Sequence, residues 1–155
     1  GSFVAAIHAG WRGLVNGVIE NTVHTLINNS LPTPSQPKTE TGDWLAWFGP
    51  CIRADQYEVG EDMREAVLNS KLFGDLTLGA EKAFTPIASF SNRPNAPRKY
   101  HADITQLARI ALNRVGVHRI YDCELCTAEN SADFFSYRRD GQTGRIASFI
   151  YIAPL

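Results

Sequence analysis

Hydrophobic and polar positions are arranged in short blocks along this chain, and most blocks predict one element each. The uninterrupted apolar run Phe3–Ile7 predicts a strand that is buried on both faces. After a glycine-rich turn, apolar residues recur at helical spacing over 14–27 and predict one continuous helix. The run 44–48 predicts a second buried strand, which Gly49–Pro50 ends.

The second half of the chain continues this alternation of helices and strands. The spacing of apolar residues predicts a helix over Glu58–Leu68. A longer helix is predicted over 104–115, with Asp103 as its N-cap and Gly116 as a left-handed cap at its C-terminal end. Arg119–Cys123 then predicts a short strand.

A β-hairpin is predicted at the C-terminal end of the chain. Its strands are Phe134–Tyr137 and Arg145–Ile152, and Asp140–Gly141 has the composition of a hairpin turn. Because strands and helices intermix along the whole chain, the predicted class is α/β or α+β, with helices covering layers of mixed β-sheet.

Composition narrows the range of functions. The 155 residues are 44% hydrophobic and 20% charged, which fits one folded domain and excludes global disorder. The net charge of −1 provides no general attraction to nucleic acids or anionic membranes. No apolar run is long enough to span a bilayer, no secretion signal opens the chain, and three cysteines argue against a disulfide framework. We therefore expect a cytoplasmic protein with neither a nucleic acid nor a membrane as partner.

The turn after the first predicted strand is the first candidate site. His8 lies between a buried strand and a helix, where open α/β sheets tend to place their ligands. Gly10 and Gly13 allow close approach of the backbone, and neutral imidazole is a common zinc ligand. The alternative is a packed histidine bonded to a carbonyl oxygen, and the local pattern leaves both interpretations open.

The cysteines form a second group of candidates. The thiol of Cys51 would be a nucleophile if His8 acted as its base, since the thiolate is the attacking species. Free cysteines are often buried, so inert packing is the alternative. Cys123 and Cys126 form a Cys-x-x-Cys pair that suits half of a zinc site or a redox pair, although no second such pair follows.

Three arginines surround the predicted hairpin turn: Arg138, Arg139 and Arg145. The planar guanidinium group suits phosphate and carboxylate, so one of these arginines is a candidate for holding an anionic substrate. Because neighbouring residues of a strand point to opposite faces, Arg138 and Arg139 cannot both face one ligand on a regular strand. A solvated turn with ordinary ion pairs is the alternative.

Several longer strings occur in the order and spacing of a known family. They are His-Ala-Gly-Trp-Arg-Gly at 8–13, Gly-Pro at 49–50, Tyr-Glu-Val-Gly at 57–60, Cys-Thr at 126–127 and Phe-Phe-Ser-Tyr-Arg-Arg-Asp at 134–140. With these strings the chain resembles the YfiH family, also called the multicopper polyphenol oxidase or laccase-domain family. The resemblance implies a layered α/β sandwich similar to that of the cytotoxic necrotizing factor deamidases.

The resemblance also implies a catalytic zinc site of two histidines and one cysteine. Of these ligands only His8 is expected here, because residues 3–155 resemble the C-terminal portion of a single domain whose N-terminal portion is absent. Cys51 is not one of the implied ligands. A catalytic zinc needs three protein ligands and an open position, so we expect His8 alone to hold metal weakly. Zinc is the implied cofactor, with copper as the alternative.

The implied activity is phosphorolysis of purine nucleosides together with adenosine deamination, so a purine nucleoside and phosphate are the expected small-molecule partners. Arg12, Arg138 and Arg139 are the candidates for binding the phosphate. Three alternatives stay open: a cysteine-dependent hydrolase using Cys51 and His8, a laccase-like polyphenol oxidase, and an inactive binding domain. The absent strands are also expected to leave a cut sheet edge that promotes self-association.

Overall fold

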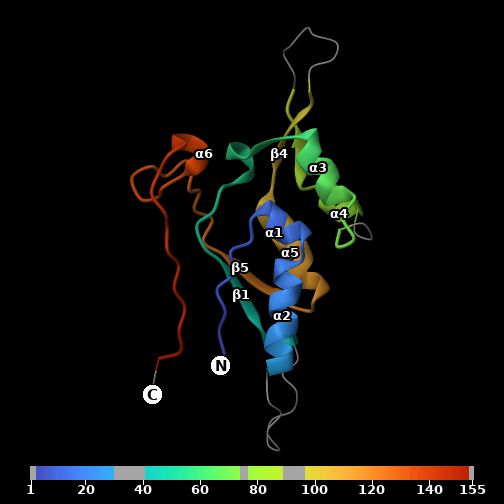
Figure 1. Cartoon of the computed structure of the whole chain (residues 1–155), viewed down its shortest axis with the longest axis vertical. Helices are drawn as coiled ribbons and strands as arrows, with labels where there is room; N and C mark the ends of the chain where they lie inside the picture. Colours follow the sequence, from blue (N-terminus) through green and yellow to red (C-terminus); the bar gives the residue numbers. More distant parts are fainter. Residues whose placement is uncertain (1–2, 30–40, 74–76, 89–96, 154–155) are drawn as a thin grey trace, which may run out of the picture.

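Two small sheets and a group of helices make up the fold (Figure 1). The computed structural model describes residues 3–29, 41–73, 77–88 and 97–153. A parallel sheet pairs β1 (Leu45–Phe48) with β5 (Arg119–Asp122). An antiparallel sheet has the order β2-β4-β3, formed by Glu58–Gly60, Lys99–Ala102 and Phe84–Pro86. Helices combined with parallel and antiparallel pairing confirm the predicted α/β class.

Several helices accompany the two sheets. The α-helices of the described residues are α1 (Trp11–Val15), α2 (Val18–Asn29), α3 (Glu61–Leu68), α4 (Thr77–Glu81), α5 (Ile104–Arg114) and α6 (Tyr137–Asp140), and two 3-10 turns are η1 (Thr41–Asp43) and η2 (Ala54–Gln56). The helix predicted after Asp103 is confirmed as α5. Asp103 Oδ1 accepts a hydrogen bond from the Gln106 backbone N–H at 2.9 Å, and Gly116 follows the helix with φ of +83°. In the part of the chain that the structure describes, no helix has both the length and the apolar character needed to cross a membrane.

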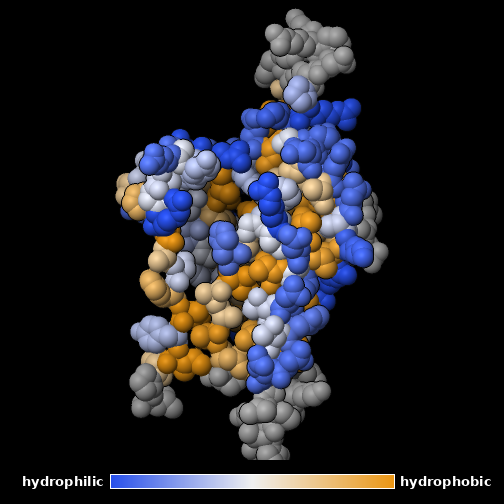
Figure 2. Space-filling view, viewed as in Figure 1, coloured by the Kyte–Doolittle hydropathy of each residue, from blue (hydrophilic) through white to orange (hydrophobic). Residues whose placement is uncertain are grey.

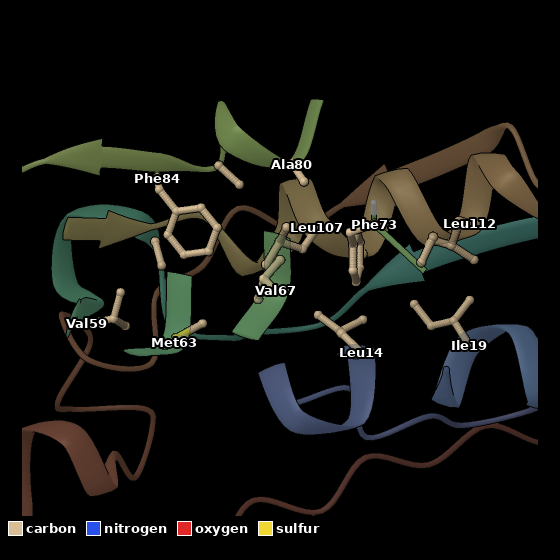
Figure 3. Close-up of a cluster of buried hydrophobic side chains, with 14 of the residues drawn as sticks. Leu14, Ile19, Val59, Met63, Val67, Phe73, Ala80, Phe84, Leu107 and Leu112 are labelled. Carbon is tan, nitrogen blue, oxygen red and sulfur yellow. The ribbon is translucent and has the colours of Figure 1, made fainter. Parts of the chain in front are cut away.

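The main core lies between α1, α2, α3 and α5 (Figure 3). Its largest fully buried side chains are Phe73, Leu14, Leu107 and Val67. Full burial of such a side chain stabilises a fold by about 1.5–3 kcal/mol. The antiparallel sheet contributes Val59, Phe84 and Tyr100 to the same cluster. We call α1, α2, α3 and α5, together with the antiparallel sheet, the helical half. Helix α6 does not belong to it.

The prediction of one continuous helix over 14–27 is wrong, because the chain turns at Gly17. Its φ is +76°, a value that side chains other than glycine rarely adopt, and its N–H bonds to the Leu14 carbonyl oxygen at 3.0 Å. A Cβ at this position would lie 3.1 Å from Leu72 Cδ1. Glycine therefore separates α1 from α2 and lets the two helices pack at different angles on the core.

The buried strand predicted at Phe3–Ile7 is absent from the structure. This segment is extended and unpaired, with Val4 and Ile7 exposed, and the ring of Phe3 meets Trp44 edge-on at 5.2 Å. The run 44–48 does form β1, but Leu45 and Trp47 are exposed rather than buried. A strand is buried on both faces only if other elements pack against both faces of its sheet. The described residues pack against one face of β1, so the other face stays exposed.

The predicted C-terminal hairpin is also wrong. Ser136 Oγ accepts a hydrogen bond from the Arg139 N–H at 3.4 Å, and Gly141 follows with φ of +69°, so the chain forms the single helical turn α6. The N-cap and the left-handed glycine therefore prevail over the hairpin signal of Asp140–Gly141. Residues 141–153 are extended without strand pairing (Figure 1).

Candidate functional site

The His-Ala-Gly-Trp-Arg-Gly string forms the start of α1. Gly10 is the N-cap residue, and its carbonyl oxygen accepts the Leu14 N–H at 3.0 Å. The imidazole of His8 lies beside Gly10, and its Nε2 would be 3.7 Å from a Cβ at position 10, an ordinary van der Waals distance. His8 is exposed rather than packed in the core. The structure thus presents its ring at the surface, beside the N-terminus of a short helix.

Two of the predicted arginines act on Tyr57, Arg138 by direct contact and Arg12 through its charge. Arg138, from α6, places its Cζ 4.9 Å from the centroid of the Tyr57 ring and donates a hydrogen bond from Nη1 to the Glu58 carbonyl oxygen at 2.6 Å. Arg12, from α1, places its Cζ 4.7 Å from the centroid of the Trp11 ring, and its positive charge lowers the pKa of the Tyr57 phenol. We call Arg12, Tyr57 and Arg138 the arginine–tyrosine cluster. It joins residues from near the two ends of the chain.

The electrostatics of this cluster suit an anion. Burial raises the pKa of Tyr57, and the positive charges of Arg138 and Arg12 oppose this rise without cancelling it. The phenol therefore stays protonated at neutral pH and can donate a hydrogen bond. Guanidinium groups donate to phosphate oxygens with matching geometry. The sequence analysis did not predict a functional role for Tyr57, although this residue belongs to one of the strings that carry the family resemblance.

The guanidinium group of Arg139 has a different environment from that of Arg138. Its guanidinium has five N–H donors, and five hydrogen bonds occupy them. Nε and Nη2 bond to the two carboxylate oxygens of Asp140 at 2.7 Å each, Nη2 also bonds to the Phe134 carbonyl oxygen, and Nη1 bonds to the carbonyl oxygens of Thr127 and Ala128. These contacts tie α6 to the loop before it and leave no N–H for a ligand in this conformation.

Cys51 lies in a loop beside a second thiol. It forms an isolated parallel bridge with Cys126, and its backbone carbonyl accepts the Thr127 N–H at 3.0 Å. All three cysteines are free thiols. Burial is the main reason that the pKa of Cys51 rises to about 11, with Arg53 opposing it. His8 is not among the groups that act on this thiol. A protonated thiol without a base does not support a nucleophilic role.

A buried ion pair lies next to Cys51 and was not predicted. Asp122, at the end of β5, accepts hydrogen bonds from Arg53 at 2.9 and 2.5 Å and from Arg109 of α5 at 3.2 Å. The side chain of Asp122 is 8% exposed. Arg53 is the main reason that the pKa of Asp122 lies below its usual value. This group connects the parallel sheet to the helical half.

The described residues do not by themselves fit a zinc or copper site. Within residues 3–29, 41–73, 77–88 and 97–153, no three His, Cys, Asp or Glu side chains lie together in a way that could hold a metal ion. His8 offers one imidazole, whereas a catalytic zinc uses three protein ligands. No chemical step through a metal can be derived from these residues alone.

The sequence matches the family described as multi-copper polyphenol oxidoreductase laccase over residues 1–153. The chain therefore belongs to this family, as the motif strings predicted. The arginine–tyrosine cluster and the exposed His8 both lie on strings that carried that resemblance. The family description points to metal binding without specifying which metal this chain uses.

Particular relatives are named for their activity. The chain is 42% identical to purine nucleoside phosphorylase YfiH of Escherichia coli over 152 residues, which cover 98% of this chain and 52% of the relative. A purine nucleoside phosphorylase of Pseudomonas aeruginosa is 38% identical, with 98% and 53% covered. The chain thus spans about half the length of the curated relatives it matches.

Solved structures agree with this assignment. A Neisseria meningitidis protein is 37% identical and superimposes with a TM-score of 0.65, covering 86% of this chain and 45% of that one. The YfiH protein of Bacillus licheniformis is 25% identical with a TM-score of 0.66, covering 86% and 43%. The fold of this chain therefore matches less than half of each of these two solved chains.

Proposed function

We propose that this chain contributes the phosphate-binding part of a purine nucleoside phosphorylase. The observation that carries the proposal is the arginine–tyrosine cluster, in which Arg138 lies over the ring of a protonated Tyr57 and the charge of Arg12 acts on the same phenol. The names of relatives that are 38–42% identical support the choice of reaction. Whole-protein activity is proposed, because the chain covers 52% of the E. coli relative.

In this reaction a phosphate oxygen attacks C1′ of the ribose while the bond from C1′ to the purine nitrogen breaks. The products are ribose-1-phosphate and the purine base, which takes up a proton from solvent. Arg12 and Arg138 neutralise the phosphate and orient it toward C1′, and the Tyr57 hydroxyl donates a hydrogen bond to a further phosphate oxygen. Fixing the nucleophile in this way lowers the entropic part of the barrier.

Zinc dependence is a further part of the proposal, with copper as the alternative metal. His8 contributes one ligand, and the other ligands come from outside the described residues. Titration of the chain with Zn²⁺ is expected to show weak binding that is lost in His8→Ala. Tight binding that survives His8→Ala contradicts the role of His8. Adenosine deamination, if it accompanies phosphorolysis, produces inosine without added phosphate, and a cytoplasmic location fits both reactions.

The test uses a chimera in which residues 1–155 replace the matching half of the E. coli relative. Inosine and adenosine are supplied with phosphate, and ribose-1-phosphate and free base are measured. We expect phosphate-dependent turnover. A folded chimera that binds inosine without releasing base overturns the proposal and identifies an inactive binding domain. Oxidation of a phenol in place of phosphorolysis identifies the laccase-like alternative.

Variants of the cluster locate the phosphate site. Arg12→Gln and Arg138→Gln are each expected to raise the KM for phosphate about tenfold or more, since each removes a charge-assisted hydrogen bond. Arg64→Gln is the matched control, because Arg64 lies on α3 and pairs with Glu61 and Glu81. An equal rise in KM for all three variants contradicts the assignment. Tyr57→Phe is expected to have a smaller effect in the same direction.

A further inference from the structure

Two consecutive residues hold Arg138 in place. Tyr57 contributes the ring under the guanidinium group, with 4.9 Å between Arg138 Cζ and the ring centroid. Glu58 contributes its backbone carbonyl oxygen, which accepts a hydrogen bond from Arg138 Nη1 at 2.6 Å. A shift of this short segment therefore moves both contacts of Arg138 at once. We call Tyr57 and Glu58 the holding segment.

The holding segment fixes Arg138 without neutralising its charge. The Glu58 carboxylate pairs with Lys99 Nζ at 3.2 Å, and the group that binds Arg138 is the uncharged backbone carbonyl. Among the described residues, Arg138 forms no ion pair with a carboxylate. Figure 2 shows mainly hydrophilic residues over α6, in contrast to the hydrophobic residues over the C-terminal segment that Figure 1 places below it. The exposed Arg138 is thus open to a hydrated anion.

Hydrogen bonds fix the backbone of Tyr57 on both sides. Its N–H donates to the Ala54 carbonyl oxygen at 3.0 Å, a bond that closes the 3-10 turn η2. Its own carbonyl oxygen accepts the Ala102 N–H of β4 at 2.9 Å. Figure 1 shows η2 between β4 and α6. The position of this turn therefore determines where the holding segment meets α6.

One side chain of β4 contacts the turn directly. His101 Nδ1 lies 3.1 Å from the Ala54 carbonyl oxygen, the same oxygen that accepts the Tyr57 N–H. A carbonyl oxygen has two lone pairs and can accept both bonds. We assign the hydrogen to Nδ1, because a carbonyl oxygen only accepts. The two residues are 47 positions apart in the sequence, so this bond is a long-range restraint on η2.

We propose that His101 is a positioning residue for phosphate binding. Its imidazole holds the Ala54 carbonyl, and through this carbonyl it keeps the holding segment where Tyr57 and Glu58 contact Arg138. The inference rests on the proposed role of the arginine–tyrosine cluster in binding phosphate. His101 acts through the backbone of η2 and contributes no group to the phosphate itself.

The competing interpretation is a histidine that only stabilises the antiparallel sheet. His101 lies in the middle strand β4, opposite Glu58 of β2 and Thr85 of β3. In that role its loss would lower stability and leave the phosphate affinity of the folded molecules unchanged. The contact of Nδ1 favours positioning, because it goes to η2 and not to either neighbouring strand.

Two substitutions separate this hydrogen bond from the rest of the side chain. In His101→Asn the side-chain amide N–H takes the place of Nδ1–H, so the bond to Ala54 is retained. In His101→Leu a side chain of similar bulk has no donor. His118→Leu is the matched control, because His118 Nδ1 contacts Asn113 Oδ1 near the end of α5. Far-UV circular dichroism and the melting curve verify that each variant folds.

Hydrogen exchange of the 155-residue chain tests the restraint without substrate or phosphate. His101→Leu is expected to accelerate exchange of the Tyr57 amide several-fold, because the acceptor of that amide loses the bond that holds it. His101→Asn and His118→Leu are expected to keep the rate of the unsubstituted chain. An unchanged rate in His101→Leu overturns the restraint and with it the proposal.

Phosphate affinity is measured on the same variants. Inorganic phosphate is titrated into the chain, and the KM for phosphate is measured in the chimera with the E. coli relative. His101→Leu is expected to raise the Kd and the KM about threefold to tenfold, with kcat at saturating phosphate changed less than about twofold. His101→Asn is expected to restore both constants, and His118→Leu to leave them unchanged.

The outcomes distinguish this inference from the proposed function. Phosphate-dependent turnover with an unchanged KM in His101→Leu overturns the positioning role alone. A rise in KM that His101→Asn does not reverse, or that His118→Leu reproduces, also overturns it, since the hydrogen bond is then not the cause. An unsubstituted chain that binds no phosphate, together with a chimera that shows no phosphate-dependent turnover, overturns both.

Discussion

The helical half and the parallel sheet use similar apolar residues with opposite outcomes. Leu107 of α5 is fully buried, whereas Trp47 of β1 is 61% exposed. The apolar faces of α1, α2, α3 and α5 meet one another and close a core (Figure 3). The outer face of β1 and β5 meets no such partner among the described residues, so its apolar side chains stay in contact with solvent.

The difference follows from where each element finds its hydrogen bonds. A helix pairs its own backbone groups and needs neighbours only for its apolar stripe. A strand needs neighbours for its backbone and, in a parallel sheet, cover on both faces. Segments 3–9 and 141–153 have the apolar composition of strands but no described partner, and so they remain extended. The apolar side chains of the helical half are therefore covered, whereas those on the outer face of β1 and β5 stay exposed.

The largest expected change in the free energy of unfolding is for a substitution in the helical half. Leu107→Ala removes a fully buried side chain between α5 and its neighbours. We expect the free energy of unfolding to fall by about 2–5 kcal/mol, since such truncations lose both transfer energy and packing. Urea denaturation followed by circular dichroism measures this loss. A change below about 1 kcal/mol would mean that the helical half is not the stable part of the chain.

The same contrast explains how far the sequence could be interpreted. The signals of α5 are local, since Asp103 and Gly116 lie at its own ends, and its position was predicted correctly. The signals around α6 were local but ambiguous, because Asp140–Gly141 suits a hairpin turn as well as the end of a helix. The buried strand predicted at Phe3–Ile7 depended on partners that no local pattern specifies.

The candidate site shows the same limit. Arg12 and Arg138 were predicted as candidates from residue type and motif. Their approach to Tyr57 depends on long-range packing that brings α1, η2 and α6 together, so the sequence could not separate Arg138 from Arg139. The structure separates them, because every N–H of Arg139 is occupied. Likewise, burial of the Cys51 thiol is a tertiary property that its position after β1 does not reveal.

Asp122 tests the connection between the two regions. Asp122→Asn keeps the shape of the side chain but removes the charge that Arg53 and Arg109 share. We expect a loss of about 2 kcal/mol at neutral pH, since hydrogen bonds to charged groups contribute about 1.5–3 kcal/mol. Hydrogen exchange should rise more in β1 and β5 than in the helical half. Uniform acceleration across the chain would contradict a role at this connection.

The pH dependence of stability provides an independent check on Asp122. Arg53 holds the pKa of its carboxyl below the ordinary value of 3.8 in the folded state. The stabilisation is therefore complete above pH 4 and is lost as the pH falls through the lower, folded pKa. We expect the stability difference between the unsubstituted chain and Asp122→Asn to shrink below about pH 4. Denaturant titrations at a series of pH values measure it, and a difference that grows on acidification would reverse the assigned sign.

A substitution at Arg139 is expected to have a smaller effect, confined to local amide exchange. Arg139→Gln removes most of the five hydrogen bonds that tie α6 to the preceding loop. Amide exchange should become several-fold faster over 127–140, while the core helices keep their protection. Arg145→Gln is the matched control, because its guanidinium bonds only to the carbonyl oxygens of Thr143 and Gly144 among the described residues. If both variants loosen α6 equally, the five contacts of Arg139 do not hold it.

The smallest expected change in stability is on the outer face of the parallel sheet. Trp47→Ser replaces one of the largest side chains, yet 61% of that residue is already exposed. We expect the free energy of unfolding to change by less than about 0.5 kcal/mol, as for other surface substitutions. The same urea titration used for Leu107→Ala measures this change. Because tryptophan is larger than leucine, a smaller cost at the larger residue would show that position, and not residue size, distinguishes the core of the helical half from the outer face of the parallel sheet. A loss comparable to that of Leu107→Ala would instead show that Trp47 is already packed, and the contrast between the two regions would fail.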